Sequence, residues 1–167
     1  MKKEILGIQF DDLTRQEAAQ AGAELLAEDK FHYVVTPNPE FILAAEKDRE
    51  FCQVLNGADL VLADGIGVVY SARIKGTPLK GRVPGIEFAA DMLVCLNETG
   101  GRLYLLGAKP GVAEEAGRRI VEQYPNIVLC GTQDGYFKDE EAALLKVAAA
   151  RPDLLFVCLG APKQEKW

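Results

Sequence analysis

Residues 59–69 read DLVLADGIGVV, and this stretch decides the fold. The apolar run 60–63 has the length and composition of a buried strand. It stops at an acidic residue, Asp64, which is followed by Gly65 and, two positions later, Gly67. A helical pattern resumes after the second glycine. A buried strand that passes through a tight turn into a helix is the unit from which parallel α/β sheets are built.

Asp64 is the first candidate for a catalytic group. In an open α/β sheet, the loops at the carboxyl ends of the strands form the crevice in which ligands bind. Gly65, which follows Asp64, lets the backbone turn tightly and lets a ligand come close. An aspartate in this place can equally cap the helix that follows it. The stretch alone therefore leaves a catalytic and a structural role open.

Length and composition are those of an ordinary globular protein. The chain has 167 residues, of which 49% are hydrophobic and 26% charged, and residues 1–167 are predicted to form a single domain. The formal net charge of -6 argues against nucleic-acid binding, which usually needs a basic face. No apolar run approaches the roughly 20 residues of a membrane-spanning helix. The four cysteines form no CxxC pair, which favours reduced thiols in a cytosolic protein.

Strand and helix patterns alternate along the whole chain. The expected strands are 4–10, 31–36, 60–63, 102–106, 126–131 and 154–159. Between them lie helical patterns, one opened by a capping box of Thr14 and Glu17 and another by Asn38 and Pro39. The alternation predicts an α/β, Rossmann-like fold with a largely parallel sheet of about six strands and helices on both faces.

Five of the expected strands end in loops of unusual composition. These loops are TPNP from Thr36, DGIG from Asp64, GAKPG from Gly107, DGYF from Asp134 and GAPKQ from Gly160. Because the carboxyl ends of parallel strands meet at one edge of a sheet, the five loops are expected to lie together. Several open into helices, whose free N–H groups and positive dipole ends suit phosphate. Lys109, Lys163 and Arg82 could add positive charge.

Several motifs of nucleotide enzymes are missing. There is no GxxxxGK[ST] loop, no GxGxxG after the first strand and no GxSxG elbow. No Asp-x-Asp pair is present to hold a divalent ion on a diphosphate, so backbone dipoles and Lys or Arg would have to act on phosphate. The residues alone indicate an α/β protein with a crevice for a phosphorylated or nucleotide ligand.

Each candidate also has a structural interpretation that the sequence leaves open. Asn38 could be only a helix cap, and Lys109 only a surface lysine. Tyr136 could serve in packing rather than in base stacking. Gln164 could be the first exposed residue of a helix, and Arg82 a solvated loop charge. For Arg82 the glycines and prolines around it favour a functional role.

Taken together, six segments resemble the WecG/TagA/CpsF glycosyltransferase family, and within it the TagA branch. They are TPNPEF (36–41), ADLVLADGIGVV (58–69), GRVPGIEF (81–88), LLGAKPGVAEEA (105–116), GTQDGYF (131–137) and PDLLFVCLGAPKQEKW (152–167). The resemblance implies transfer of N-acetylmannosamine, with inversion, from UDP-ManNAc to polyprenyl-diphosphate-linked GlcNAc. This reaction makes the linkage unit of wall teichoic acid at the inner face of the cell membrane, and it is expected to need neither metal nor cofactor.

The resemblance also implies a role for each candidate residue. Asp64 would take the proton of the acceptor hydroxyl group. Thr36 and Asn38 would position the sugars, and Arg82 would contact a diphosphate. The other substrate-binding candidates are Gly65, which lets the ligand come close, and, for the UDP part, Gly107, Lys109, Gly111, Tyr136 and Gln164.

Members of the family continue past the QEKW motif with a basic and apolar C-terminal segment, which this sequence lacks. That segment is expected to help bind the lipid diphosphate and the membrane, and its loss would expose an apolar surface that favours a homo-oligomer. Three other functions stay open: transfer from another UDP-sugar, such as a ManNAc uronic acid or a hexose donor, an NAD-dependent oxidoreductase, and a non-catalytic nucleotide-binding module. The missing GxGxxG motif argues against the oxidoreductase.

Overall fold

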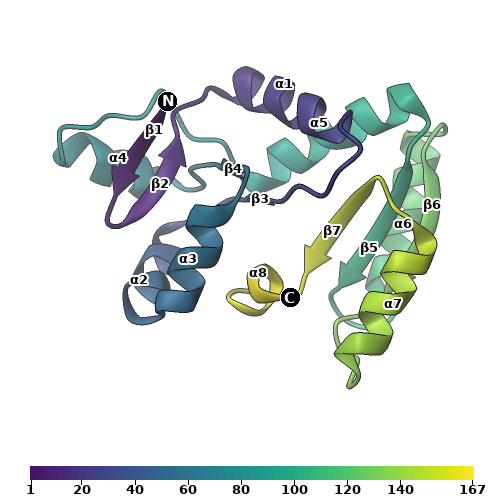
Figure 1. Ribbon diagram of the computed structural model, residues 1–167. Helices are drawn as coiled ribbons and strands as arrows, with labels where there is room; N and C mark the ends of the chain where they lie inside the picture. The colour runs from purple at the N-terminus through teal and green to yellow at the C-terminus, as the bar shows by residue number, and fades with distance from the viewer. The chain divides into compact units, whose positions relative to one another are not determined.

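A computed structural model describes residues 1–167, and Figure 1 shows its helices and strands. The chain forms two compact units, unit 1 with Met1–Met92 and Ala161–Trp167 and unit 2 with Leu93–Gly160. The predicted α/β class is confirmed. The predicted single sheet of about six strands is not observed, because the strands form separate sheets of two, two and three strands. The assignment of residues 1–167 to one domain stays a prediction.

The N-terminal strand predicted at 4–10 is wrong. The chain instead forms an antiparallel hairpin of β1 (Lys2–Ile5) and β2 (Ile8–Asp11). Leu6 and Gly7 make the turn with φ angles of 52° and 84°. Two central residues with positive φ suit a two-residue hairpin turn, but leucine rarely adopts this conformation. The glycine alone did not indicate the turn, because the residue before it is a leucine in an apolar run.

A parallel pair of short strands positions the loops of unit 1. β3 (Val34–Val35) pairs with β4 (Leu60–Val61). The backbone pairing continues beyond both strands, where the Asp64 N–H donates to the Pro37 carbonyl oxygen at 3.1 Å. The loops that follow the two strands therefore run side by side.

The hairpin and the parallel pair share one core with three helices of unit 1, α2, α3 and α4. Phe10, Phe51 and Leu55 are fully buried in this core. The helices that unit 1 contains, in whole or in part, are α1 (Arg15–Leu26), α2 (Pro39–Lys47), α3 (Arg49–Gly57), α4 (Ile66–Ile74), α5 (Gly85–Thr99) and α8 (Lys163–Lys166). None of the helices of the chain is long and apolar enough to cross a bilayer.

The predicted capping box of α1 is confirmed, and its Glu17 also forms an ion pair with Lys80 in the loop that precedes α5. Thr14 and Glu17 exchange hydrogen bonds, and Lys80 Nζ lies 2.6 Å from Glu17 Oε1. The hydrogen bond from Lys80, with those from Thr14, lowers the pKa of Glu17 to about 2. The folded-state pKa is thus below the ordinary 4.5. The stabilisation is present above the ordinary pKa and is lost as the pH falls through the folded-state value.

We expect Glu17→Gln to flatten the dependence of the free energy of unfolding on pH between about 4.5 and about 2. The amide cannot carry the charge whose interactions depend on pH. Urea unfolding at a series of pH values across this window measures the effect. Glu24→Gln is the control, because Glu24 lies on the same helix and has no ion pair. A Glu17→Gln profile as steep as that of the unmodified chain would contradict the prediction.

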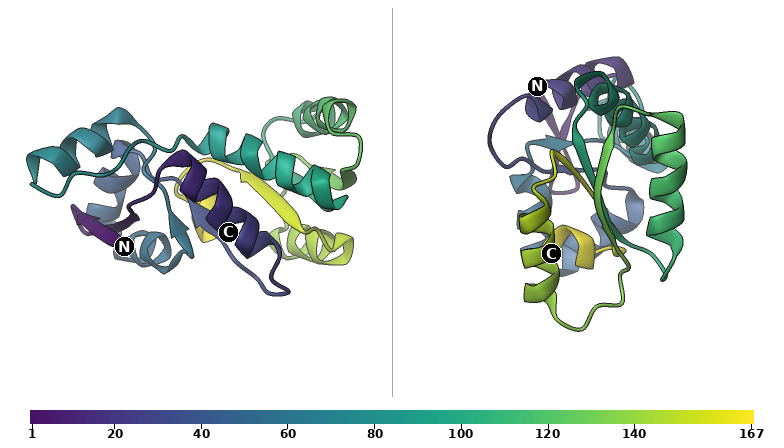
Figure 2. Two further views of the ribbon diagram at one scale, coloured as in Figure 1. Left: turned by 90° about the horizontal axis from the view of Figure 1, so that it is seen from above. Right: turned by 90° about the vertical axis from the view of Figure 1, so that its right-hand side faces the viewer.

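Unit 2 is built on a parallel sheet with the strand order β6–β5–β7. β5 (Arg102–Gly107) lies between β6 (Val128–Gln133) and β7 (Leu154–Cys158). α6 (Val112–Gln123) and α7 (Glu140–Ala150) cover opposite faces of this sheet, as Figures 1 and 2 show. The middle strand is buried along nearly its whole length, as expected for a strand that is covered on both faces. The strands and helices predicted for this region are confirmed, with β6 shifted slightly toward the C-terminus.

Candidate active site

Asp64 lies just after β4, where three loops of unit 1 meet. They are the loop that follows β3 (residues 36–39), the loop of Asp64 itself, and the segment 83–85, which opens α5. The Gly85 N–H donates a hydrogen bond to Asp64 Oδ2 at 3.1 Å. The carboxylate therefore caps α5, which is distant in sequence. The helix that directly follows, α4, begins after Gly65 without any side-chain cap.

Only one carboxylate oxygen of Asp64 is engaged within the chain. Oδ2 accepts from Gly85, while Oδ1 has no hydrogen bond and no ion pair. The side chain is partly buried, and the positive end of the α5 dipole stabilises its negative charge. A carboxylate that is fixed through one oxygen and open at the other can accept a proton from a hydroxyl group bound beside it.

Thr36 lies against the same helix N-terminus. A Cβ atom at Gly85 would come within 2.7 Å of Thr36 Oγ1, so the glycine makes room for the hydroxyl group. Gly85 thus contacts both Thr36 and Asp64, and the structure brings these two predicted site residues together. The sequence did not indicate the role of Gly85, although the residue lies in GRVPGIEF (81–88), one of the segments that resemble the family.

Asn38 is a helix cap, as its sequence context predicted. Its Oδ1 accepts hydrogen bonds from the Glu40 N–H at 2.9 Å and the Phe41 N–H at 3.1 Å. The Nδ2 atom of the side chain makes no hydrogen bond within the chain and can donate to a ligand. A Cβ atom at Gly65 would lie 3.4 Å from Pro39 Cδ, so this loop and the loop of Asp64 are in contact.

Arg82 is exposed in the loop that precedes α5, and its guanidinium group has no ion pair or hydrogen bond within the chain. The backbone on both sides of it is fixed. The Lys80 N–H donates to Asp12 Oδ1 at 2.7 Å, and the Val83 N–H donates to the Ala63 carbonyl oxygen at 2.9 Å. A guanidinium group held in this way is available for a phosphate group.

Gln164 belongs to unit 1 through the short helix α8. Its Nε2 donates to Glu165 Oε1 at 2.7 Å. Lys166 Nζ lies 2.8 Å from Asp48 Oδ2 and 2.6 Å from Glu50 Oε2, and these ion pairs fix α8 against α3. Burial raises the pKa of the Glu165 carboxyl group. The part of Gln164 in ligand binding stays a prediction.

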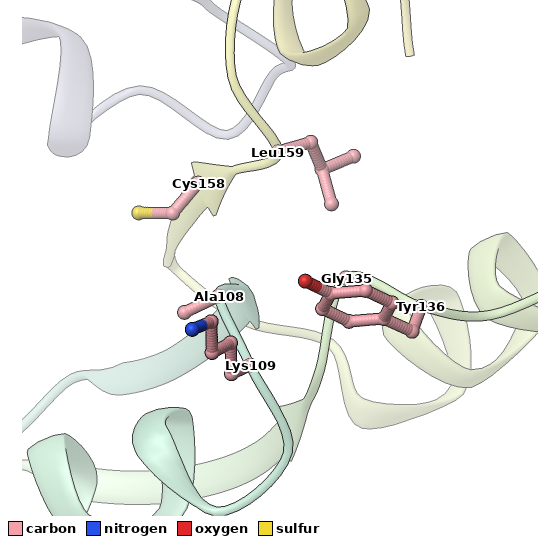
Figure 3. Close-up of a pocket in the computed structure, with 6 residues that line it drawn as sticks. All are labelled: Ala108, Lys109, Gly135, Tyr136, Cys158 and Leu159. Atoms are coloured by element: carbon pink, nitrogen blue, oxygen red, sulfur yellow. The ribbon is translucent and has the colours of Figure 1, made fainter.

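Unit 2 has a pocket of its own beyond the carboxyl ends of its three strands (Figure 3). Its volume is about 330 Å³. Two of the loops singled out in the sequence, GAKPG and DGYF, meet there with the end of β7, as expected for the carboxyl ends of parallel strands. The residues that line the pocket are Ala108, Lys109, Gly135, Tyr136, Cys158 and Leu159.

Two of the predicted glycines, Gly107 and Gly111, lie within two residues of Lys109 in the chain but do not line the pocket. Gly107 ends β5 with a φ angle of 128°, and a Cβ atom there would lie 2.2 Å from the Cys158 carbonyl oxygen. The next residue, Ala108, donates its N–H to the same oxygen at 3.1 Å and accepts from the Gly135 N–H at 2.9 Å. These hydrogen bonds join the loops of Ala108 and Gly135 to the end of β7. Gly111, with a φ angle of 83°, is the N-cap of α6 and supplies no side-chain cap.

The pocket of unit 2 has the chemistry to hold a nucleotide. Figure 3 shows Lys109 and the Tyr136 ring on different sides of it. Lys109 is exposed and has no ion pair. The nearby N-terminus of α6 offers free N–H groups and a positive dipole end, which favour a phosphate group. Tyr136 is 67% exposed, so its ring face is available for stacking on a base.

Comparison with known proteins identifies the family. The model of the Glycosyl transferase WecG/TagA/CpsF family matches residues 3–167. The chain belongs to this family. A relative from Bacillus subtilis (strain 168), named N-acetylglucosaminyldiphosphoundecaprenol N-acetyl-beta-D-mannosaminyltransferase, is 39% identical over 134 residues, which make up 80% of this chain and 52% of the relative. A relative of the same name from Staphylococcus aureus (strain NCTC 8325 / PS 47) is 31% identical over an alignment of 168 positions, which covers 99% of this chain and 66% of the relative.

In this member of the WecG/TagA/CpsF family, the predicted site residues fall into two groups. Unit 1 holds the loops of Asp64, Thr36 and Asn38 in direct contact, with Arg82 in the segment that leads to Gly85. Unit 2 holds the pocket with Lys109 and Tyr136, and Gly107 and Gly111 lie within two residues of Lys109 in the chain. The structure contains no group of three or more His, Cys, Asp or Glu side chains that could hold a metal ion. Independence of metal stays a prediction.

Proposed function

We propose that the chain carries the base and the donor pocket of an inverting hexosaminyltransferase. In this proposal N-acetylmannosamine moves from UDP-ManNAc to GlcNAc on polyprenyl diphosphate, in the synthesis of the wall teichoic acid linkage unit. The names of the Bacillus and Staphylococcus relatives describe mannosaminyl transfer to such a lipid-linked GlcNAc. The observation that carries the proposal is the Asp64 carboxylate, which is held at one oxygen by the Gly85 N–H and open at the other.

The proposed reaction is a single displacement at the anomeric carbon of the donor sugar. The acceptor hydroxyl oxygen bonds to this carbon while the bond from the carbon to the β-phosphate oxygen of UDP breaks. Asp64 takes the proton of the hydroxyl group, as a base must in an inverting transfer. The bonding electron pair leaves with UDP, whose added negative charge is stabilised by nearby cations and backbone N–H groups.

The surroundings of Asp64 suit the other roles. The Thr36 hydroxyl group and the Nδ2 atom of Asn38 lie in the loop that contacts the Asp64 loop and helix α5, so they would bind the sugars. Arg82 would bind a diphosphate. The pocket of unit 2 would hold UDP, with Lys109 and the α6 N-terminus near the phosphates. The role of Tyr136 would be stacking on uracil, and Gln164, in unit 1, would also bind the substrate.

A polyprenyl-linked acceptor is held in a membrane, so the enzyme would have to act at the membrane surface. We place the protein on the cytoplasmic side, as a peripheral protein at the inner face of the cell membrane, because UDP-sugars are soluble donors and the acceptor is a lipid. No helix of the chain could span that membrane. A homo-oligomer and the use of neither metal nor cofactor are parts of the same proposal.

Calorimetric titration with UDP tests the donor site. We expect binding of UDP without added metal and no binding of NAD. Arg82→Ala should weaken UDP binding about 10-fold or more, since hydrogen bonds to charged groups contribute about 1.5–3 kcal/mol. The free energy of unfolding should change little, because the exposed Arg82 side chain makes no hydrogen bond or ion pair within the chain.

Arg49→Ala is the matched control for this titration. Arg49 is exposed on α3 and likewise has no ion pair, so its replacement should leave UDP binding unchanged. Binding of NAD in place of UDP would overturn the proposed function. Equal losses in the two variants would remove Arg82 from the diphosphate site.

A further inference from the structure

The outer face of α4 is apolar and exposed, and the proposed reaction does not use it. Ile66, Tyr70 and Ile74 recur every four residues along this helix, and they are 54%, 53% and 86% exposed. Val68 and Ala72, on the opposite face, are fully buried. The helix is thus packed on the protein by one apolar face and presents a second apolar face to the solvent. Figure 1 shows it beside the hairpin of β1 and β2.

The same region is basic in an acidic protein. Residues 65–86 contain four basic residues and no acidic residue, although the chain as a whole has a net charge of -6. Two of the four, Arg73 and Lys75, lie at the end of α4, are exposed and have no ion pair. We call the combined apolar and basic region the α4 surface, defined as Ile66, Tyr70, Arg73, Ile74 and Lys75.

The α4 surface begins at the proposed active site. Ile66 is two residues from Asp64 in the chain. Gly85, whose N–H binds the Asp64 carboxylate, is followed by Ile86, which is 80% exposed. An exposed isoleucine therefore follows within two residues, in the chain, on each of the two elements joined by the hydrogen bond between Gly85 and Asp64. A lipid tail on a substrate bound at Asp64 would find an apolar surface next to it.

We propose that the α4 surface docks on an anionic lipid bilayer. The inference rests on the proposed function, in which the acceptor is a lipid held in the membrane. A helix in the plane of the interface inserts its apolar face at the acyl boundary, and basic residues beside that face bind the anionic head groups. Tyrosine is enriched at this depth, because its ring is apolar and its hydroxyl group is polar.

Charge argues for a bilayer rather than a second copy of the chain as the partner. In a two-fold dimer the same patch meets itself. Contact between two α4 surfaces would bring Arg73 and Lys75 of one copy against the same residues of the other, with no acidic residue in the patch to pair with them. An anionic bilayer complements both the apolar and the basic part of the surface.

Flotation with lipid vesicles tests the inference. The chain should bind vesicles of phosphatidylcholine and phosphatidylglycerol, and bind less to phosphatidylcholine alone or at high salt. Arg73→Gln with Lys75→Gln should weaken binding to the anionic vesicles about 10- to 30-fold, because each charge contributes about 5-fold, or about 1 kcal/mol. Tyr70→Ser with Ile74→Ser should weaken binding to a similar extent.

Matched controls are available in unit 2. Leu144→Ser with Leu145→Ser replaces apolar side chains that are 53% and 63% exposed on α7. Lys138→Gln with Lys146→Gln removes two exposed charges that have no ion pair. Both controls should keep vesicle binding within about 2-fold, as surface changes away from a binding site have small effects.

Each outcome decides the inference. It is overturned if the unmodified chain does not bind anionic vesicles, or if the α4 variants and the controls behave alike. It is also overturned if the α4 variants change only the oligomeric state in analytical ultracentrifugation, which would make the surface a contact between copies. UDP titration of the same variants separates the two proposals. Absent UDP binding in the unmodified chain counts against the proposed function, whereas retained UDP binding with lost vesicle binding supports the α4 surface.

Discussion

Asp64→Asn is expected to lower the rate of sugar transfer by about a hundred- to ten-thousand-fold, because an amide cannot take the proton of the acceptor hydroxyl group. The fold should survive. Asparagine keeps an oxygen that can accept the hydrogen bond from the Gly85 N–H, so α5 retains its cap. The measurement is UDP release from UDP-ManNAc in the presence of a short-chain diphosphate-GlcNAc acceptor, with urea unfolding of the same samples.

Asp64→Ala separates the two functions of this carboxylate. Alanine removes both the base and the cap, so the transfer rate should fall as far as in Asp64→Asn. The free energy of unfolding should also fall, by about 1 kcal/mol, which is typical for loss of a helix cap. Transfer by Asp64→Asn at a rate near that of the unmodified chain would remove Asp64 from the role of the base.

Gly107→Ala should destabilise unit 2 by about 3 kcal/mol or more, because it combines backbone strain with a steric clash. A Cβ atom would lie 2.2 Å from the Cys158 carbonyl oxygen, which is closer than non-bonded atoms can come. Gly107 and Cys158 are register partners at the end of the β5–β7 pairing, so the two strands would have to separate there. Urea unfolding measures the loss of free energy of unfolding. UDP binding should also weaken, because the pocket loops are joined at this point.

Gly111→Ala is the control for this variant. Gly111 also has a positive φ angle, 83°, but a Cβ atom there would meet nothing within 4 Å. Only the strain of a non-glycine residue at positive φ remains, about 1 kcal/mol. If both variants lose the same free energy of unfolding, the contact with Cys158 does not explain the requirement for glycine at residue 107.

The fold of unit 2 was predictable because its signals are local. β5 is a continuous apolar run, and a helical pattern follows both β5 and β6, so the alternation could be read directly. In unit 1 the decisive features are not local. The hairpin turns at Leu6, a residue that rarely makes such turns, and β3 and β4 are only two residues long. An apolar run in the sequence shows that a strand can form but not which other strand it pairs with. The prediction of one large sheet was wrong for this reason.

The candidate site was predictable to the extent that it lies at strand ends. Asp64 and Thr36 follow the two strands that pair in parallel, and this pairing places their loops together. Capping by Asn38 followed from the proline after it. The hydrogen bond between Asp64 and Gly85 joins residues 21 apart in the chain, and no local pattern reports such a contact.

The backbone hydrogen bonds on both sides of Arg82 reduce the entropy that is lost when a ligand binds. The hydrogen bonds of Lys80 with Asp12 and of Val83 with Ala63 order this loop when the protein folds. The conformational entropy of its backbone is therefore lost before any substrate arrives, and only the rotamers of the guanidinium side chain remain to be restricted. Preorganisation of this kind lets more of the attraction between the cation and a diphosphate appear as affinity.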